Sequence, residues 1–365
     1  SRARKHAELN VSRDRFHDAV YPTYKFPFSF KGLKNTFKSL YVKWLIGFNS
    51  SEKGIERLRK KINTLERRNP KYNYCKAQLQ EHKPDLVFCT TQRATQSISA
   101  LLAAQDLGIP TVVFVYSWDN MPKAMQVVET DYYVVWSDLM KEQVLQYYPF
   151  IKEEQVFVTG TPQFEAHYDT SLKQTKEDFF TEHGLNVNKK YICFSGDDET
   201  TSPLDQYYLE DLANAVRNLN TKGYNLGIIY RKCPVDFTNR YVNVIEANKD
   251  IIEVLNPIWK QSGTMWNEVL PAKEDLKMLY NVCEHCEFVT NVCSSTVFDF
   301  VVHNKPCIYY NYEQPQLNKG IRNIGQNYNY VHFRSMPSQE AAVFCSDKQD
   351  LEGLVKQILD GTLTN

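Results

Sequence analysis

The chain of 365 residues is 42% hydrophobic and 13% aromatic, so it can bury a sizeable core and has the length of about two domains. Its 43 basic and 43 acidic residues cancel, which excludes a protein whose whole surface is built to bind nucleic acid. The sequence has no apolar run near the roughly 18 residues of a membrane span and no recognisable signal peptide. We therefore expect a cytoplasmic protein.

Basic residues gather at the N-terminus, where residues 1–71 contain 18 Lys and Arg against six Asp and Glu. We assign residues 1–83 to a basic, aromatic segment that is part of the first domain or packs on it. Residues 25–46 interleave aromatic side chains with lysines, as a helix at a membrane surface does. The alternative is a solvated helix pair that covers the first sheet. Residues 52–71 predict a charged, exposed helix.

From residue 84 the chain alternates short apolar runs with amphipathic stretches, which predicts a parallel sheet covered by helices. The first domain spans residues 84–165. Its expected strands are 84–89, 111–115, 131–136 and 155–158, and its expected helices are 95–107 and 137–148.

The second domain spans residues 166–345, and a C-terminal helix lies within residues 346–365, at 351–359. Its expected strands are 190–195, 225–230, 287–291 and 306–311, and its expected helices are 204–219, 274–282 and 296–303. This order predicts an α/β fold of two Rossmann-like, doubly wound domains that face each other across a cleft. In such sheets ligands bind beyond the carboxyl ends of the strands, so the loops that follow the strands are the candidate sites.

The segment after residues 111–115 is dense in polar chemistry. Ser117, Trp118, Asp119 and Asn120, with Lys123 after them, bring a hydroxyl, an indole, a carboxylate, an amide and an ammonium group to one loop. A helix cap with a packed tryptophan explains the same residues without a ligand.

Two glycine turns are candidates for phosphate binding. Gly160 and Thr161 follow the last strand of the first domain, where they form either a phosphate-binding turn or a plain interdomain turn. Ser195 and Gly196 follow the first strand of the second domain and precede a helix. Three acidic residues come next, at 197–199, and would repel a pyrophosphate, so a contact with a sugar hydroxyl is equally supported there.

Arg231 follows another strand of the second domain and has the right shape for bidentate phosphate binding, with a surface salt bridge as the alternative. Ser294, Ser295 and Thr296 begin a helix, where hydroxyls and amides can bind anionic oxygen or simply cap the helix. Asp299 comes one turn later and can accept hydrogen bonds from a sugar or ribose.

The segment 117–120 with Lys123, the segment Val158–Phe164 and the pattern of the second domain together resemble GT-B type glycosyltransferases of bacterial surface-polysaccharide synthesis. The likeness covers about residues 84–312. A glycine usually follows the lysine in this pattern, whereas this chain has Ala124. The resemblance implies a metal-independent glycosyltransferase without cofactor, which moves a sugar from a nucleotide-activated donor to the hydroxyl of a glycan or lipid-linked acceptor.

Under this hypothesis each motif has a role. Asp119 is the candidate general base, and Lys123 assists it. The acceptor side also includes Ser117, Trp118 and Asn120. The donor side consists of Gly160, Thr161, Ser195, Gly196, Arg231, Ser294, Ser295, Thr296 and Asp299, which stabilise the leaving phosphate or hold the sugar. The expected partners are the nucleotide sugar, the acceptor and a membrane surface contacted by residues 25–46, without nucleic acid.

Two neighbouring families share parts of this pattern. Teichoic-acid polymerases that transfer glycerol phosphate from a CDP-linked donor carry Asp-Tyr-Ser-Ser and Arg-x-His-Pro motifs, where this chain has Val292-Cys-Ser-Ser295 and Arg231-Lys-Cys-Pro234. CDP-polyol transfer is therefore the second hypothesis, beside a non-catalytic scaffold. Non-hydrolysing nucleotide-sugar epimerases share the fold, but their His and paired Glu pattern is not found here.

The nine cysteines are scattered and odd in number, which favours buried thiols over a disulfide framework. Cys283 and Cys286 have the spacing of metal ligands but lack a second pair at zinc-ribbon distance. We therefore expect no metal site.

Overall fold

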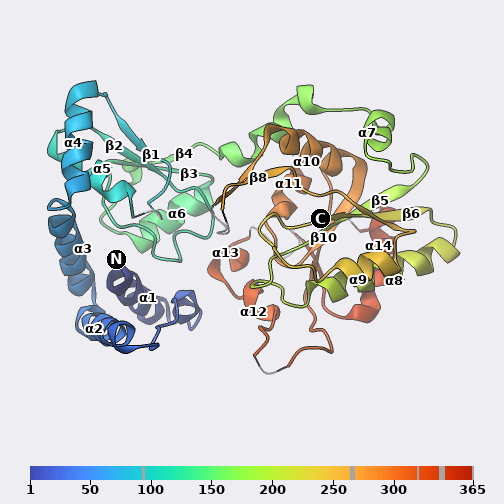
Figure 1. The fold of residues 1–365 in the computed structure, drawn as a ribbon, viewed down its shortest axis with the longest axis horizontal. Coiled ribbons are helices and arrows are strands. Elements are labelled where there is room, and N and C mark those ends of the chain that lie inside the picture. The colour runs from blue at the N-terminus through green and yellow to red at the C-terminus, as the bar shows by residue number, and fades with distance from the viewer. Residues whose placement is uncertain (93–94, 264–267, 319, 337–341, 364–365) are drawn as a thin grey trace. The chain divides into compact units, whose positions relative to one another are not determined.

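The computed structural model describes residues 1–365 except 93–94, 264–267, 319, 337–341 and 364–365. The chain divides into two compact units, Ser1–Thr161 and Pro162–Asn365. Each unit is built around its own parallel sheet (Figure 1).

The sheet of the first unit has four parallel strands in the order β1-β2-β3-β4. These strands are β1 (Val87–Cys89), β2 (Thr111–Phe114), β3 (Tyr132–Val135) and β4 (Val156–Val158). Helix α5 (Ser97–Asp106) connects β1 to β2, and α6 (Asp138–Tyr147) and the short η2 (Glu153–Gln155) lie between β3 and β4. Apolar residues of α5, α6 and the strands form one core, which includes Leu101, Val113, Val135 and Val144. The carboxyl ends of all four strands therefore lie along one edge of this sheet.

Four helices precede this sheet. They are α1 (Arg2–Phe16), α2 (Leu33–Asn49), α3 (Glu52–Glu66) and α4 (Pro70–His82), with a short turn η1 (Tyr21–Tyr24) after α1. The charged helix expected over residues 52–71 ends at Glu66, because Asn69 caps a new helix whose first residue is Pro70. Helices α1, α2 and α3 pack together around Ala7, Ile55 and Leu58.

The sheet of the second unit has six parallel strands in the order β12-β11-β10-β5-β6-β7. They are β5 (Lys190–Ser195), β6 (Leu226–Arg231), β7 (Ile252–Val254), β10 (Cys286–Asn291), β11 (Cys307–Tyr310) and β12 (Val343–Cys345), and a separate hairpin pairs β8 (Trp259–Gln261) with β9 (Val269–Pro271). The helices are α7 (Lys176–Glu182), α8 (Asp205–Thr221), α9 (Val242–Ala247), α10 (Lys273–His285), α11 (Thr296–Val302), α12 (Gly325–Tyr328), α13 (Val331–Arg334) and α14 (Leu351–Leu359), with the short turns η3 (Pro162–Tyr168), η4 (Thr170–Leu172) and η6 (Lys348–Asp350).

Strand β5 shows why this sheet is covered on both faces. Its side chains alternate between two buried clusters, because successive residues of a strand point to opposite faces. Ile192 and Phe194 pack with residues of α8 and α14, whereas Tyr191 and Cys193 pack with residues of α7, α10 and α11. The second unit is thus doubly wound, and its strand order reverses between β5 and β10. Parallel sheets covered by helices in both units confirm the predicted α/β class.

Candidate functional site

Three hydroxyl groups meet where the strand order of the second unit reverses. Ser195 is the last residue of β5, and its Oγ lies 3.2 Å from Oγ1 of Thr296, the first residue of α11. The Oγ of Ser294 lies 2.9 Å from the same Thr296 oxygen. Three of the residues predicted to bind the donor therefore come together at the carboxyl edge of the sheet, from two loops that are about a hundred residues apart in sequence.

The turn that carries Ser294 is fixed by buried side chains. Cys293 has a φ of 45°, a left-handed conformation that is uncommon outside glycine, and its N–H donates to the Tyr328 hydroxyl at 3.0 Å. Asn291 accepts from the Ser294 N–H at 2.9 Å, and the Tyr309 hydroxyl donates to the Ser294 carbonyl at 2.8 Å. Backbone strain held by such contacts is typical of functional turns. Ser295 lies in this turn, and within the described chain its side chain makes no capping hydrogen bond.

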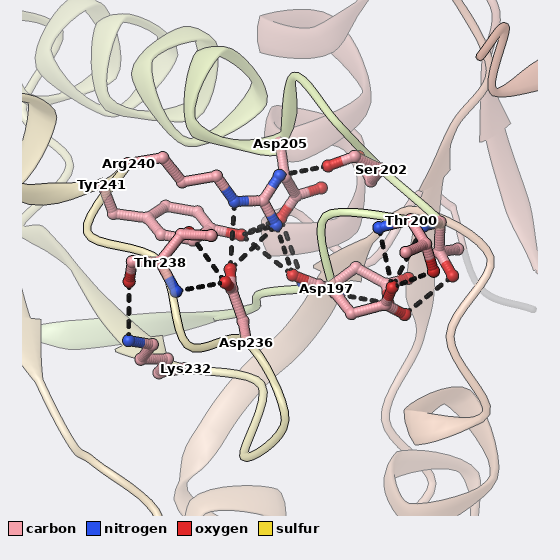
Figure 2. A network of polar contacts seen from close by, with 11 residues as sticks. Asp197, Thr200, Ser202, Asp205, Lys232, Asp236, Thr238, Arg240 and Tyr241 are labelled. Atoms are coloured by element: carbon pink, nitrogen blue, oxygen red, sulfur yellow. Dashed lines mark hydrogen bonds and ion pairs between the residues drawn. The ribbon is translucent and has the colours of Figure 1, made fainter. Parts of the chain in front are cut away.

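The loop after β5 is anchored by a buried polar network (Figure 2). The carboxylate of Asp205 accepts from the N–H of Asp197 at 3.1 Å and from the Tyr241 hydroxyl at 2.7 Å. The guanidinium of Arg240 donates to the Asp197 carbonyl at 2.5 Å and to the Asp236 carboxylate at 3.0 Å. Figure 2 shows these groups converging from the loops that follow β5 and β6. The network holds the Asp197 backbone in one position.

Gly196 lies where this loop leaves the sheet. A Cβ at this position would come within 3.1 Å of both the Tyr230 ring and the Tyr241 hydroxyl, so glycine packs here more closely than a residue with a side chain could. The Gly196 N–H already donates to the Arg231 carbonyl at 2.9 Å. Its amide is therefore used in the sheet, and its contribution to the site is close packing.

The three consecutive acidic residues after Gly196 have different surroundings. Burial, with smaller contributions from Asp205 and Asp198, raises the pKa of Asp197 well above its usual range. Although burial acts to raise the pKa of Asp198, hydrogen bonds from Thr200 and Thr201 lower it overall, and they bind its carboxylate into a turn. Glu199 is exposed. The repulsion expected from this run is therefore reduced, because one carboxyl tends to stay protonated and another already accepts four hydrogen bonds.

Arg231 is buried and already paired. Its Nη2 donates to both carboxylate oxygens of Asp275, at 2.8 and 2.9 Å. The same carboxylate accepts from the indole N–H of Trp259 at 2.7 Å and from the N–H of Ile258 at 2.8 Å. This pairing ties β6 to α10 and neutralises the guanidinium charge. Phosphate binding by Arg231 stays a prediction.

Asp299 belongs to a chain of buried and partly buried ionisable groups that the sequence did not indicate. Its Oδ1 lies 2.9 Å from Nε2 of His167, whose Nδ1 lies 3.0 Å from Nε2 of His303. Nδ1 of His303 in turn lies 2.9 Å from Glu284. The hydrogen bond from Lys173 is the main cause that lowers the pKa of Glu284 to about 2, and burial is the main cause that lowers the pKa of His303. The carboxylate at one end of this chain is therefore charged over the physiological range.

In the first unit, the segment after β2 is folded on itself. Lys123 forms an ion pair with Asp119, and the side-chain amide of Asn120 donates to the Ser117 carbonyl at 2.9 Å. Trp118 is half-buried against the core of this unit. Ser117, Trp118, Asp119, Asn120 and Lys123 thus form one local cluster beyond the carboxyl end of β2.

The backbone conformation of Ala124 shows why the glycosyltransferase pattern usually has glycine at this position. Its φ is 53°, in the left-handed region that glycine enters without a steric cost, and it is buried. The guanidinium of Arg4 donates to its carbonyl at 2.7 Å and to the carbonyl of Gln126 at 2.5 Å. A residue of α1 therefore holds the turn that glycine would form alone.

Gly160 and Thr161 follow β4 and are the last residues of the first unit. Gly160 has a φ of 76°, so this turn does require glycine. These two residues belong to the first unit, whereas the other residues predicted for the donor belong to the second.

Over the residues that the structure describes, no group of three or more His, Cys, Asp and Glu side chains could hold a metal ion. All nine cysteines are free thiols, and seven of them are buried, including Cys283 and Cys286. The prediction of buried thiols is confirmed. Among the described helices, none is long and apolar enough to cross a membrane.

No family model and no curated protein matches the chain. Solved structures do resemble it. A putative UDP-N-acetylglucosamine 2-epimerase from Listeria monocytogenes is 12% identical, with a TM-score of 0.53 and coverage of 99% of this chain and 86% of that one. The UDP-GlcNAc 2-epimerase from Neisseria meningitidis, solved with UDP-GlcNAc bound, is 12% identical over 83% of this chain and 74% of its own, with a TM-score of 0.53. The UDP-GlcNAc 2-epimerase from Methanocaldococcus jannaschii is 14% identical, with a TM-score of 0.52 and coverage of 81% and 77%. The chain therefore has the GT-B fold.

Proposed function

We propose that this protein is a glycosyltransferase of surface-glycan synthesis that takes its sugar from a nucleotide-activated donor. The observation that carries the proposal is the cluster of Ser195, Ser294 and Thr296 hydroxyls at the reversal point of the second sheet. Ligands of doubly wound sheets bind at such points. The likeness in fold to an epimerase solved with UDP-GlcNAc bound supports a nucleotide sugar as the ligand.

The three hydroxyls suit the leaving phosphate of the donor. Each can donate a hydrogen bond to an anionic oxygen, and their turns are already held by Asn291, Tyr309 and Tyr328. Donors that are fixed before the reaction stabilise developing negative charge without reorganising. Asp197, whose raised pKa favours its protonated form, can donate a further hydrogen bond from the neighbouring loop. The chemistry needs no metal in this arrangement.

The acceptor is bound by the first unit in this proposal. The bond between the anomeric carbon of the sugar and the donor phosphate breaks, and the phosphate leaves with its electron pair. A new bond forms from the acceptor oxygen to the anomeric carbon, and Asp119 takes the proton of the acceptor hydroxyl. Lys123, which forms an ion pair with Asp119, holds this carboxylate in position.

The outer face of α2 favours an acceptor at a membrane surface. The large apolar residues of this face recur at helical spacing and are 53% to 79% exposed; they are Leu33, Phe37, Leu40, Tyr41, Trp44 and Phe48. Exposed lysines flank them, and the sequence from Lys25 to Ser50 contains five lysines and no acidic residue. The opposite face packs on α1 and α3 through Val42, Leu45 and Ile46. Aromatic side chains beside lysines match an anionic lipid surface.

Flotation with lipid vesicles tests the membrane contact. The protein should float with vesicles that contain phosphatidylglycerol, less with pure phosphatidylcholine, and less again at high salt. The double variant Phe37→Ser, Trp44→Ser should lose at least about tenfold in vesicle affinity, because the buried apolar area falls. The matched control Tyr168→Ser removes an aromatic side chain that is 74% exposed in the second unit, and it should float normally. Equal flotation of the double variant and the wild type would remove this part of the proposal.

Epimerisation of a nucleotide sugar is the second candidate, and the fold likeness to UDP-GlcNAc 2-epimerases favours it. An epimerase needs one substrate and no acceptor, so it has no use for an exposed apolar and basic face on the other unit. The α2 face therefore favours transfer over epimerisation.

The experiment that tests the proposal is a thermal-shift screen with UDP, GDP, CDP, CMP and dTDP, each alone and as its sugar conjugate, and with CDP-glycerol. A ligand that binds only the native state raises its Tm. We expect one nucleotide and its sugar conjugate to raise Tm selectively. A shift with CDP-glycerol alone would favour CDP-polyol transfer, and no shift with any nucleotide would favour a non-catalytic scaffold.

A further inference from the structure

The chain of ionisable groups that ends at Asp299 connects the carboxyl edge of the second sheet with the surface of the second unit. His167 in η3 and His303 after α11 form its middle, and their side chains are only 3% and 4% exposed. Glu284 of α10 follows, and its carboxylate lies 2.5 Å from Nζ of Lys173, which is half exposed. The proposed function gives a role to Asp299 alone, so the two histidines are buried ionisable groups without an assigned task.

The outer end of this chain determines which atoms donate. The hydrogen bond from Lys173 is the main cause that lowers the pKa of Glu284 to about 2, so this carboxylate is ionised and only accepts. Nδ1 of His303, 2.9 Å away, therefore donates to it. Burial lowers the pKa of His303 and favours its neutral form, in which Nε2 is an acceptor. Nδ1 of His167, which lies 3.0 Å from this Nε2, then carries a proton.

The inner end of the chain needs one more proton. Nε2 of His167 lies 2.9 Å from Oδ1 of Asp299. A hydrogen bond between these two atoms contains one proton, carried by either the nitrogen or the oxygen. Without it, a nitrogen lone pair would face an ionised oxygen in the interior, where unpaired polar groups are costly. The Asp299–His167 pair therefore holds one exchangeable proton, as imidazolium with carboxylate or as imidazole with carboxylic acid.

No neighbouring group of the described chain takes the place of this proton. Burial raises the pKa of the Cys283 thiol well above its usual range, so the thiol stays neutral beside Asp299. The Tyr280 ring stacks on the His167 ring at a centroid distance of 6.4 Å. The titratable and charged groups around the pair are Tyr280, Cys283 and Glu284 on α10, Lys173 at the end of η4, and His303 and Lys305 after α11.

Asp299 is close to the hydroxyl cluster of the donor site. It follows Thr296 by three residues in α11, so the two side chains are neighbours on one face of the helix, with Cβ atoms about 5–6 Å apart. Oδ2 of Asp299 accepts no hydrogen bond from the residues that the structure describes, and 12% of the side chain is exposed. One carboxyl oxygen thus holds His167, and the other can contact a ligand.

We propose that Asp299 gives a proton to the leaving phosphate, and that His167 positions Asp299 and holds that proton. The inference rests on the proposed function, since it concerns the phosphate that leaves in sugar transfer. As the bond from the anomeric carbon to the phosphate oxygen breaks, this oxygen keeps the electron pair and takes the proton of the pair. His167 is left neutral and Asp299 ionised. After the products leave, the pair regains a proton from water, to which Asp119 loses the proton of the acceptor.

NMR of the whole chain tests the proton without any substrate. The protein is isotope-labelled in its histidine ring nitrogens and its aspartate carboxyl carbons, and the variants His167→Gln, His303→Gln and Asp299→Asn assign the signals. At neutral pH we expect a proton on Nε2 of His167 or on the carboxyl of Asp299, and a neutral His303 with its proton on Nδ1. An ionised Asp299 facing an unprotonated Nε2 of His167 would overturn the inference.

Turnover of the nucleotide sugar tests the catalytic role. His167→Gln should lower kcat about 100-fold, because the amide makes hydrogen bonds but carries no exchangeable proton, whereas nucleotide affinity should stay at the wild-type value. The wild-type kcat should fall as pH rises through the loss of the proton seen by NMR, and His167→Gln should lose this dependence. His82→Gln, at an exposed histidine of α4, is the control and should behave like the wild type.

A wild-type kcat and pH profile in His167→Gln would overturn the assignment. If this variant has a lowered Tm, Asp299→Asn replaces it and should show the same loss of kcat and of pH dependence. The two failures are distinguishable. A transferase whose rate ignores both substitutions contradicts this inference alone, whereas a chain that binds no nucleotide contradicts the proposed function, and the NMR result still decides whether the pair holds its proton.

Discussion

The carboxyl edges of the two sheets differ in how their polar groups are held. In the second unit, a long-range hydrogen-bond network holds the polar groups: the Asp197 backbone is bonded to the side chains of Asp205 and Arg240, and Tyr241 donates to Asp205. In the first unit, the polar cluster at Asp119 is held by contacts within one short segment, the ion pair with Lys123 and the hydrogen bond from Asn120 to the Ser117 carbonyl. Under the proposed function, the difference fits two tasks: the edge of the second unit, held by a long-range network, positions the donor, and the edge of the first unit, held by local contacts, binds the acceptor.

The largest effect should come from the general base of the first unit. Asp119→Asn should lower kcat about 10²- to 10⁴-fold, because an amide cannot accept the acceptor proton. Nucleotide affinity should stay unchanged, since Asp119 is not among the residues proposed to bind the donor. Asp85→Asn, at an exposed aspartate of the same unit, is the control. Steady-state rates together with nucleotide titration measure both quantities, and undiminished turnover would remove Asp119 as the base.

The second-largest effect concerns the stability of the second unit. Asp275→Ala should lower the free energy of unfolding by about 3–5 kcal/mol, because it leaves the buried guanidinium of Arg231 without its partner. Asp250→Ala breaks the exposed pair with Arg217 and should cost at most about 1 kcal/mol. Urea unfolding of both variants measures the two values. Similar losses in both would contradict the claim that the buried pair holds this edge.

The third effect is a pH dependence in the same unit. The pKa of Asp197 is raised in the folded state above its unfolded value of about 3.9, so the folded state holds this proton more tightly. The contribution of this group to stability is complete below that unfolded pKa and is lost as pH rises through the folded pKa.

Asp197→Asn should therefore flatten the decline of unfolding free energy as pH rises above the unfolded pKa of about 3.9. Urea unfolding at several pH values, with Asp85→Asn as the control, measures the two slopes. Parallel slopes for the wild type and Asp197→Asn would show that this carboxyl titrates normally.

The smallest expected effect concerns the strained turn at Ala124 in the first unit. Ala124→Gly should raise the free energy of unfolding by up to about 1 kcal/mol, because glycine adopts a φ of 53° without steric cost. Ala103→Gly, in the middle of α5, should lower it by a similar amount. Thermal unfolding distinguishes the two directions, and a loss of stability in both variants would mean that Ala124 is not strained.

The sequence predicted regular elements better than long-range contacts. Residues 190–195 and 351–359 have the bounds that their apolar patterns indicated. The Ser195, Ser294 and Thr296 cluster was also predictable, because all three residues follow parallel strands and such loops share one edge.

Other features depend on contacts that no local pattern records. The prediction of one helix over residues 52–71 was wrong, although Pro70 was a signal for a break. The pairing of His167 with Asp299 spans 132 residues, and that of Arg4 with the Ala124 carbonyl spans 120. Such pairs arise from tertiary packing, as does the burial that raises the pKa of Asp197.

The most direct test of the central claim is to identify the products of one turnover. The protein is incubated with the nucleotide sugar found by the screen, labelled in the sugar, and with vesicles that contain a lipid-linked phosphate acceptor. Our account predicts that label enters the lipid fraction in step with the release of nucleotide, and that neither occurs without the acceptor. An intact nucleotide carrying an epimerised sugar would contradict it.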